Sequence, residues 1–325
     1  MKILLQNRDA VNRRHFIPRP ETMSDLSNPT GRVLDVIKLL ASQPNEDFSL
    51  ADIAQQTGMS KASAHRVLLT MTAADFLARH PRRRTYSLGM GLLAVGQASL
   101  ERYRGVEAAK IEMARMSAEL GVQCSATALI GRDLIILACD GLPKSHAGFN
   151  RVGERRPMIP PMGLCHVAWG RAALVEPYLA FAKQHMRADA YAWLLEALPL
   201  IRQRGYAMAT ASWHRLGSAV VVPAAAQRDS AHWATVCELV AELNRDEIQL
   251  AAPGDGDIRQ IGQIAAPVFA PDASMAFQLV LSGLPATLTA RKLERCIERL
   301  LAAAVAVTDQ MNGSVPAGRD AVAAR

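Results

Sequence analysis

The segment that decides the fold of the N-terminal third runs from Phe48 to Gly89 and reads FSLADIAQQTGMSKASAHRVLLTMTAADFLARHPRRRTYSLG. Ser49 is a favourable N-cap for a short helix, and Gly58 supplies the backbone freedom with which helices commonly end. Ser60 then begins a second helix, whose apolar residues recur at helical spacing. Two short helices separated by a glycine turn predict a helix-turn-helix.

The first turns of the second helix carry small or hydrogen-bonding side chains opposite the apolar residues. A recognition helix in the DNA major groove needs such side chains, because its N-terminal residues approach the base edges. The residues predicted to contact DNA there are Ser60, Lys61, Ser63, His65 and Arg66. For His65 the alternative is a place on the solvated surface of the helix.

A basic hairpin is predicted directly after the second helix. Two short strands, at Phe76–Leu77 and Tyr86–Leu88, flank the arginine run Arg82, Arg83 and Arg84. Taken alone, such a run is more often a solvated loop. In this order, after a capped helix-turn-helix, it predicts a wing whose arginines contact phosphates.

The distribution of charge agrees with a DNA-binding N-terminal part. Residues 1–105 hold 15 Lys/Arg and 9 Asp/Glu, a net charge of +6, whereas residues 106–325 hold 22 and 21, a net charge of +1. Nearly all of the formal net charge of +7 therefore lies with the helix-turn-helix. That is the pattern of a phosphate-binding unit joined to a near-neutral one.

The rest of the chain predicts mixed α/β structure. A hairpin is expected at Cys124–Ile130 and Leu134–Cys139, followed by helices at 165–183 and 188–204, a strand at 206–212, a helix at 231–244, strands at 258–269 and 275–281, and a helix from Thr289 to about Met311. Between the two parts, residues 91–100 and 106–120 predict a long linker helix that can pair with a second copy.

The cysteines and the lack of a recognisable signal peptide indicate the cellular compartment. The five cysteines, an odd number without a C-x-x-C pair, are Cys124, Cys139, Cys165, Cys237 and Cys296. They predict reduced thiols in the cytoplasm, because no signal peptide or membrane-spanning stretch is recognisable. Neither a metal site nor a cofactor is expected, since no metal-spaced Cys/His cluster occurs.

The order of motifs from Gly31 to Met311 resembles the IclR family of bacterial transcriptional regulators. The resembling stretches are GRVLDVIKLL, SLADIAQQTGMSKASAHRVLLTM, TYSLGMGLLAVG, RVGERRP, the Gly205-Tyr206 pair, IGQIAAPVF and LVLSG. The resemblance implies an α+β fold: a winged helix-turn-helix, a linker helix and a mixed α/β (GAF-like) effector-binding domain. It also implies a homodimer or homotetramer that binds a double-stranded DNA operator and a small-molecule effector.

On this basis the chain is expected to divide into five parts. These are a flexible arm (1–28), the winged helix-turn-helix (29–90), the linker helix (91–115), the effector-binding and oligomerisation domain (116–312) and a flexible tail (313–325).

The effector half departs from the family pattern where the resemblance places the ligand. The family's P-L-H-A-T-A-x-G-K-A segment is replaced by a stretch without its His, Thr or Lys, and its S-x-S-G hydroxyl pair is reduced to one serine. The predicted effector-binding residues are Met158, Ile159, Met162, Gly163, Trp213, Gln263, Val280 and Ser282. Fewer convergent donors predict a larger, more apolar or aromatic effector than a small keto acid. The alternative is a domain that has lost ligand binding and only dimerises.

An enzyme with an accessory DNA-binding domain is the competing class. Residues Gly89–Ala94 match the G-x-G-x-x-G/A dinucleotide pattern, but the preceding strand belongs to the expected wing and not to a βαβ unit. Cys165 and His166 are neighbours on an expected helix, so their side chains point about 100° apart and cannot pair. The sequence therefore predicts no catalytic residues and a protein that is not an enzyme.

Overall fold

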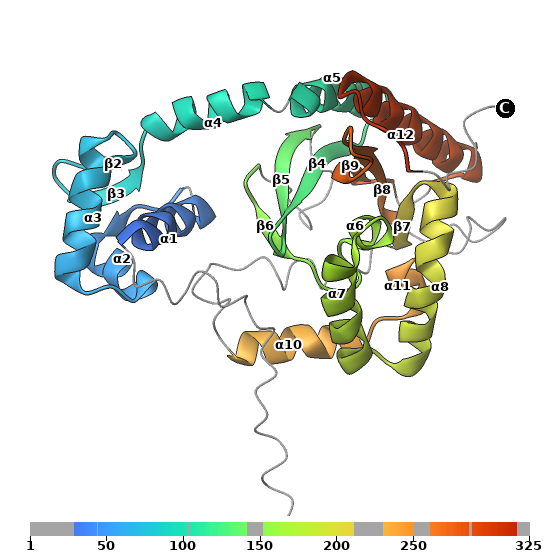
Figure 1. Cartoon of the computed structure of the whole chain (residues 1–325), viewed down its shortest axis with the longest axis horizontal. Helices are drawn as coiled ribbons and strands as arrows, with labels where there is room; N and C mark the ends of the chain where they lie inside the picture. Colours follow the sequence, from blue (N-terminus) through green and yellow to red (C-terminus); the bar gives the residue numbers. More distant parts are fainter. Residues whose placement is uncertain are drawn as a thin grey trace, which may run out of the picture.

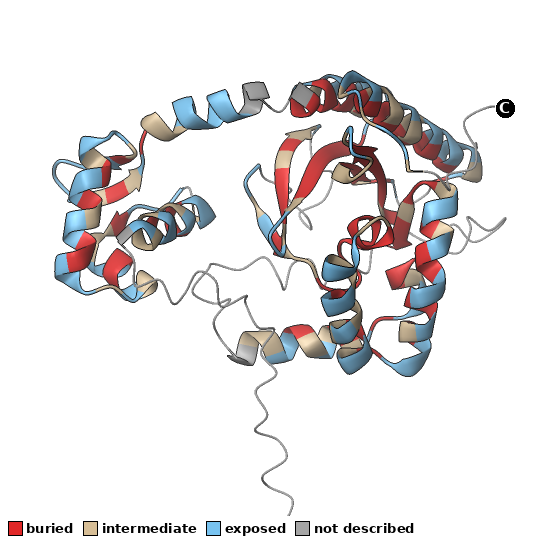
Figure 2. Cartoon of the chain, in the orientation of Figure 1, coloured by how far each residue is buried: buried red, intermediate tan, exposed pale blue. Residues whose placement is uncertain are grey.

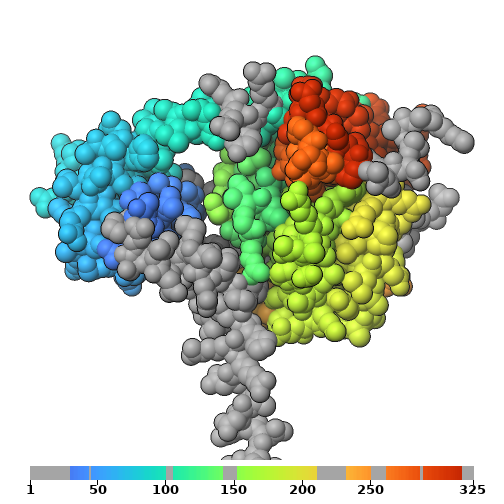
Figure 3. Space-filling view, in the orientation of Figure 1, coloured from blue at the N-terminus to red at the C-terminus, as the bar shows by residue number. Residues whose placement is uncertain are grey.

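The structure is a computed structural model that describes residues 29–43, 45–102, 104–141, 152–210, 230–249, 261–285 and 288–316. The expected arm (1–28), the residue Trp213 and most of the tail lie outside the described residues. Figure 1 shows two bodies, one formed by the N-terminal elements and one by a curved sheet with its helices, joined by helix α4. The same two bodies are seen in the space-filling view of Figure 3.

The N-terminal body is a winged helix-turn-helix, as predicted. Its elements are α1 (Pro29–Ser42), β1 (Phe48–Ser49), α2 (Leu50–Thr57), α3 (Lys61–Ala73), β2 (Leu77–Arg79) and β3 (Thr85–Leu88). The three strands form an antiparallel sheet in the order β1-β3-β2. Residues from every helix and strand of this body close one hydrophobic core, which includes Leu40, Ile53, Leu68 and Tyr86.

The helix ends follow the predicted caps. The Ser49 hydroxyl accepts a hydrogen bond from Asp52 N, and the Asp52 carboxylate accepts one from Ser49 N, which completes a capping box. Hydrogen bonds from Ser49 also hold the pKa of Asp52 below its usual value. Gly58 ends α2 in the left-handed region at φ 71°. Ser60 begins α3, and its hydroxyl accepts a hydrogen bond from Ser63 N.

The predicted linker helix consists of two helices with different surroundings. Helix α4 (Gly91–Arg102) is exposed over most of its length, as Figure 2 shows. Helix α5 (Arg104–Leu120) instead buries one side, including Met113 and Met116, in the core of the second body. The expected linker boundary at residue 115 is therefore too late. Apolar residues of α5 belong to the core, and only α4 spans the space between the bodies.

The second body is built on a six-stranded antiparallel sheet in the order β6-β5-β4-β9-β8-β7. Its strands are β4 (Gln123–Ile130), β5 (Asp133–Asp140), β6 (Arg155–Pro157), β7 (Ala207–Thr210), β8 (Ile261–Phe269) and β9 (Met275–Ser282). Helices α5 and α12 (Ala290–Gln310) cover one face. The other face is covered by α6 (Leu164–Ala168), α7 (Ala172–His185), α8 (Ala188–Arg204), α10 (Ser230–Ala241) and α11 (Arg245–Ile248).

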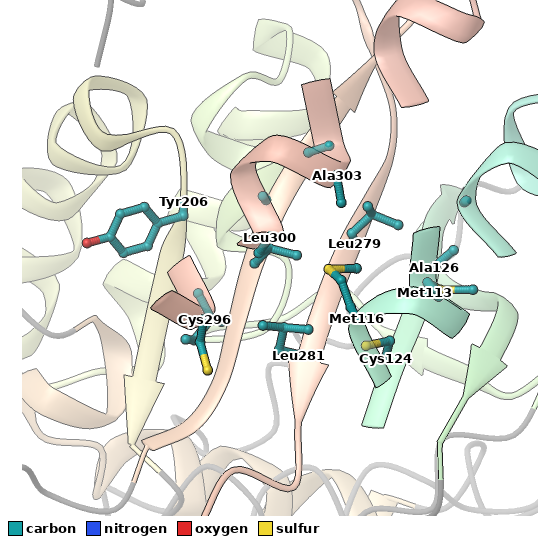
Figure 4. Packing of buried hydrophobic residues seen from close by; sticks show 14 of the residues in the cluster. Met113, Met116, Cys124, Ala126, Tyr206, Leu279, Leu281, Cys296, Leu300 and Ala303 are labelled. Carbon is teal, nitrogen blue, oxygen red and sulfur yellow. The ribbon is translucent and has the colours of Figure 1, made fainter. Parts of the chain in front are cut away.

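The face under α5 and α12 is a dense apolar layer. Figure 4 shows Met113 and Met116 of α5 near Leu279 and Leu281 of β9, with Leu300 of α12 alongside them. At the edge of this layer, the Arg299 guanidinium bonds to Glu112 at 2.9 Å and to Glu119 at 3.1 Å. These ion pairs and the apolar contacts hold α5 against α12.

Three expectations differ from the structure. The helix expected at 165–183 is two helices, α6 and α7, separated by residues 169–171. A Cβ on Gly170 would lie 2.7 Å from the His166 carbonyl oxygen, so glycine permits the close turn between them. Helix α11 was missed, although its capping box, Asn244 with Glu247, is readable in the sequence. Residues 313–316, expected in the tail, are described, and Ser314 N donates to Ala270 O.

No helix in the described ranges is long and apolar enough to cross a membrane.

Candidate functional site

The exposed face of α3 carries three of the five residues predicted to contact DNA on this helix. Lys61, His65 and Arg66 are exposed, whereas Ala64 and Leu68 on the opposite face are buried. Since residues four apart lie on one face of a helix, Lys61 and His65 are neighbours, and Arg66 extends the same face. Ser60, at the helix start, is exposed and is engaged as the N-cap.

The prediction that Ser63 lies on the exposed polar face is wrong. Ser63 is only 7% exposed, and its hydroxyl accepts a hydrogen bond of 2.6 Å from Arg32 Nη1 of α1. The helical period explains this, because a residue two positions after Lys61 lies about 200° around the helix. Ser63 therefore links α3 to α1.

Sequence reasoning missed an apolar part of the same exposed face. Ala62 and Thr70 are exposed, and Leu69 is 62% exposed. Leu69 is four residues from His65 and three from Arg66, so it continues their face by one turn. Read by helical period, the exposed face comprises Lys61, Ala62, His65, Arg66, Leu69 and Thr70. It is referred to below as the α3 face.

The wing presents its arginines at an ordered turn. Arg82, Arg83 and Arg84 are all exposed. His80 Nδ1 accepts hydrogen bonds from Arg82 N at 3.3 Å and Arg83 N at 3.1 Å. Arg84 has φ 56°, a left-handed conformation that closes the turn. The three guanidinium groups consequently extend from one hairpin tip.

The glycines of the dinucleotide-like pattern have a structural role. Gly89 N donates to Phe76 O at 2.8 Å, and Gly91 N donates to Asp75 O at 2.9 Å. A Cβ on Gly91 would lie 2.9 Å from Asp75 O, so glycine permits the end of the wing to approach the end of α3. Strand β3 before them pairs only with β1 and β2, within the described chain. A βαβ unit is therefore not formed here.

The predicted effector residues of the sheet lie together on the face that α6 covers. Gln263 of β8 pairs with Ser282 of β9, and Val280 pairs with Ala265. Val280 and Ala265 belong to the hydrophobic cluster of α6, α7 and α8. Because side chains alternate along a strand, Gln263 and Ser282 face the same way.

Strand β4 adds polar side chains that sequence reasoning missed. Gln123 pairs with Ser282, and Ser125 pairs with Val280. Ser282 Oγ donates to Gln123 Oε1 at 3.4 Å, and Ser125 is only 2% exposed. The polar sheet row, defined as Gln123, Ser125, Ser282 and Gln263, thus restores hydroxyl and amide groups where the sequence predicted a loss. The local sequence pattern could not indicate these residues, because only the pairing of β4 with β9 brings them beside Val280 and Ser282.

The predicted segment before α6 reaches the same layer. Ile159 and Met162 are buried in one cluster with Val280, and Met158 packs against it. Gly163 has φ 81°, and a Cβ there would lie 2.6 Å from Met158 Cγ. One residue into α6, Cys165 Sγ donates to Ala265 O at 3.3 Å and ties the helix to β8. Seven of the eight predicted effector residues are therefore on one side of the sheet. The eighth, Trp213, is outside the described residues.

A model of the IclR helix-turn-helix domain matches residues 29–81, from the start of α1 to the tip of the wing. The HTH-type transcriptional regulator XynR of Escherichia coli (strain K12) is 26% identical over 182 residues, 54% of this chain and 72% of the relative. The protein is a transcriptional regulator of the IclR type. A second relative, the regulator KdgR of Dickeya chrysanthemi, is 24% identical over 57% of this chain and 63% of its own length.

Solved IclR structures share the fold of this IclR-type regulator. An IclR transcriptional regulator from Alicyclobacillus acidocaldarius superimposes with a TM-score of 0.63 at 18% identity, over 87% of this chain and 98% of that one. An IclR homologue from Microbacterium hydrocarbonoxydans, solved in complex with 4-hydroxybenzoate, gives a TM-score of 0.62 at 17% identity, over 88% and 100%. The predicted α+β fold, a winged helix-turn-helix followed by a mixed α/β domain, is confirmed.

Proposed function

We propose that this IclR-type regulator binds its operator with the α3 face in the major groove and the wing on the backbone. The observation that carries this proposal is the exposed set Lys61, His65 and Arg66 on one face of the second helix of a matched IclR helix-turn-helix. Lysine and arginine donate to guanine O6 and N7, which is the commonest specific contact in the major groove. The arginines of the wing supply sequence-independent attraction to phosphates.

The protein works as a homo-oligomer in this proposal. Exposed apolar residues support it on and beside α4, where Met90 is 77%, Leu93 64% and Val95 54% exposed. A second copy that pairs along α4 would cover these side chains. The resulting two-fold pair of recognition helices would suit an operator with two half-sites.

The second body binds a small, uncharged effector in this proposal, with an apolar or aromatic body and hydrogen-bonding groups. The polar sheet row offers hydroxyls and amides, and the residues around it are apolar. Charged side chains buried in the described chain are Glu112, Arg156 and Glu247, and each has a partner of its own. The Microbacterium relative bound to 4-hydroxybenzoate supports an aromatic effector.

Footprinting tests the regulator function directly. The full chain is expected to protect a discrete region of the DNA upstream of its own gene at 0.1 M salt. Sequence-independent coating at the same protein concentration that saturates the site would contradict operator recognition. Sedimentation of the free protein measures its oligomeric state, and a monomer at micromolar concentration would refute the pairing along α4.

Leu69 is expected to contact a thymine methyl group. Thymine presents an apolar methyl group in the major groove, and Leu69 is the large apolar side chain on the α3 face. Replacing a contacted thymine by deoxyuridine should weaken wild-type binding by about 4-fold, since one buried methyl group contributes about 0.8 kcal/mol. Leu69→Ala should bind both operators equally. Binding measurements with a set of single thymine replacements check this.

Ile130→Ala is the matched control for the Leu69 experiment. Ile130 is 52% exposed and lies at the far end of β4, so its loss should leave the response to deoxyuridine at the wild-type value. If Leu69→Ala responds to every thymine replacement as the wild type does, Leu69 contacts no thymine.

A further inference from the structure

Two polar side chains are buried in the helical layer without hydrogen-bond partners. His166 of α6 is 4% exposed, and Tyr178 of α7 is 3% exposed. Across the described ranges of the chain, His166 Nδ1, His166 Nε2 and the Tyr178 hydroxyl are the buried side-chain atoms that bond to nothing. Tyr178 belongs to one hydrophobic cluster with the predicted effector residues Ile159, Met162 and Val280, and the chain neighbours of His166, Cys165 and Val167, belong to it too.

Two other polar side chains of the same layer have hydrogen-bond partners. Trp193 Nε1 donates to Arg245 O and to Gln249 O, each at 3.0 Å. The Gln249 side chain accepts a hydrogen bond of 2.9 Å from Met208 N. Polar side chains in this layer can therefore find hydrogen-bond partners, whereas those of His166 and Tyr178 have none.

Helix α6 places His166 between the sheet and the outer helices. All five residues of α6 are buried, and Cys165 bonds to the backbone of β8. Tyr178 is on the buried side of α7, together with Ala182. Figure 1 shows α6 between the sheet and α7. Both side chains are thus in the layer that covers the polar sheet row.

Leaving these atoms unpaired lowers the stability of the fold, whereas apolar residues at the same positions would not lower it. A buried donor or acceptor without a partner loses its hydration and regains nothing, whereas leucine or phenylalanine would fill the same space. Unpaired buried groups are unusual in folded proteins, and a role in binding or catalysis is one explanation for them. Since relatives of this chain are transcriptional regulators, binding is the role to consider.

The protonation states define what these groups can bind. Burial lowers the pKa of His166 to about 4, so its imidazole is neutral at pH 7. Burial also raises the pKa of Tyr178, which keeps its hydroxyl protonated. A neutral imidazole has one N–H donor and one acceptor nitrogen, and a phenol both donates and accepts. Together they can donate and accept hydrogen bonds, and neither side chain carries a charge.

We infer that His166 and Tyr178 are effector-binding residues that bind a hydroxyl group of an uncharged ligand with an apolar ring. A hydroxyl group both donates and accepts, so it can donate to the imidazole nitrogen while accepting from Tyr178. A carboxylate cannot donate, and it would be buried without a cation to balance it. The cluster that contains Tyr178 also includes Met162, with Met158 and Trp169 packed against it, and methionine sulfur packs favourably against an aromatic ring. This inference rests on the proposed function, which assigns an effector to the same body.

Thermal denaturation with three related probes tests the inference on the full chain. Methyl 4-hydroxybenzoate carries the neutral hydroxyl, methyl benzoate lacks it, and 4-hydroxybenzoate adds a negative charge. The wild type should bind methyl 4-hydroxybenzoate about 10-fold more tightly than either of the others, as judged by the rise in Tm with concentration. Tyr178→Phe and His166→Leu should each lose that preference.

The unliganded variants provide a second, independent readout. Tyr178→Phe removes one unpaired oxygen, so the Tm of the free variant should equal or exceed that of the wild type. Tyr206→Phe is the matched control. Tyr206 lies at the opposite apolar layer of the sheet, where Figure 4 shows it beside α12, so this change should leave probe binding unaltered.

Three outcomes would overturn the inference. A lower Tm of free Tyr178→Phe would mean that its hydroxyl is already satisfied in the free protein. Equal binding of methyl 4-hydroxybenzoate by the wild type and by both variants would mean that other residues hold the ligand. If none of the three probes raises the Tm of the wild type, the phenol class is wrong. None of these results affects the operator footprint, so the proposed regulator function is judged separately.

Discussion

Replacing Lys61 and Arg66 together by alanine is expected to weaken specific operator binding by about 10²–10³-fold. In the proposed complex each side chain contacts a base edge, and a good contact of this kind contributes about 1–3 kcal/mol of discrimination. Both residues are exposed, so the variant should fold and melt like the wild type. Operator titrations against a scrambled duplex of equal length measure the loss of specificity.

A charge-matched control separates base recognition from the loss of two cations. Arg171→Ala with Lys183→Ala removes the same charge from exposed positions of α7 and the residue before it. This variant should keep the ratio of specific to scrambled binding. Unchanged operator affinity of the Lys61/Arg66 variant would remove α3 from the DNA interface.

Neutralising the wing arginines is expected to weaken binding to all DNA sequences alike, by about 10²-fold at 0.15 M salt. Three released phosphate contacts should lower the slope of log affinity against log salt by about 2.7, since each contact contributes about 0.9. The variant is Arg82→Gln, Arg83→Gln and Arg84→Asn. Asparagine at the third position tolerates the left-handed backbone at φ 56° better than alanine would.

Salt titrations on operator and scrambled duplexes check the wing prediction. The two losses should agree within experimental error, because phosphate contacts carry no sequence information directly. A loss confined to the operator would mean that the wing reads bases. A change in slope below 1 would leave the arginines without phosphate contacts.

The parts of the fold that were predictable from sequence are those governed by local rules. Ser49, Gly58 and Ser60 mark helix ends by their own backbone and side-chain chemistry, and the structure uses all three as predicted. The same rules, applied more strictly, would have placed Ser63 on the buried side of α3. The break between α6 and α7 was not predicted, although the close contacts of Gly170 are with residues 166, 174 and 175, which are near it in the chain.

The proposed effector face of the sheet was less predictable, because its composition depends on strand register. Gln263, Val280 and Ser282 were found through motifs, and they do share one face. Gln123 and Ser125 join them only because β4 pairs with β9, more than 150 residues away in the chain. The inward orientation of His166 and Tyr178 likewise follows from the packing of α6 between the sheet and α7.

The alternation of side chains along β4 has a mechanical consequence. Ser125 is on the proposed effector face, while its chain neighbours Cys124 and Ala126 are in the layer that holds α5. At this point a single strand, β4, separates the proposed effector site from α5. If a bound ligand displaced Ser125, it would move the strand against which α5 packs, and α5 follows α4, the helix that leads to the DNA-binding body. A displacement on the effector face would then reach α5 through the backbone of β4 itself, without a series of intervening side chains.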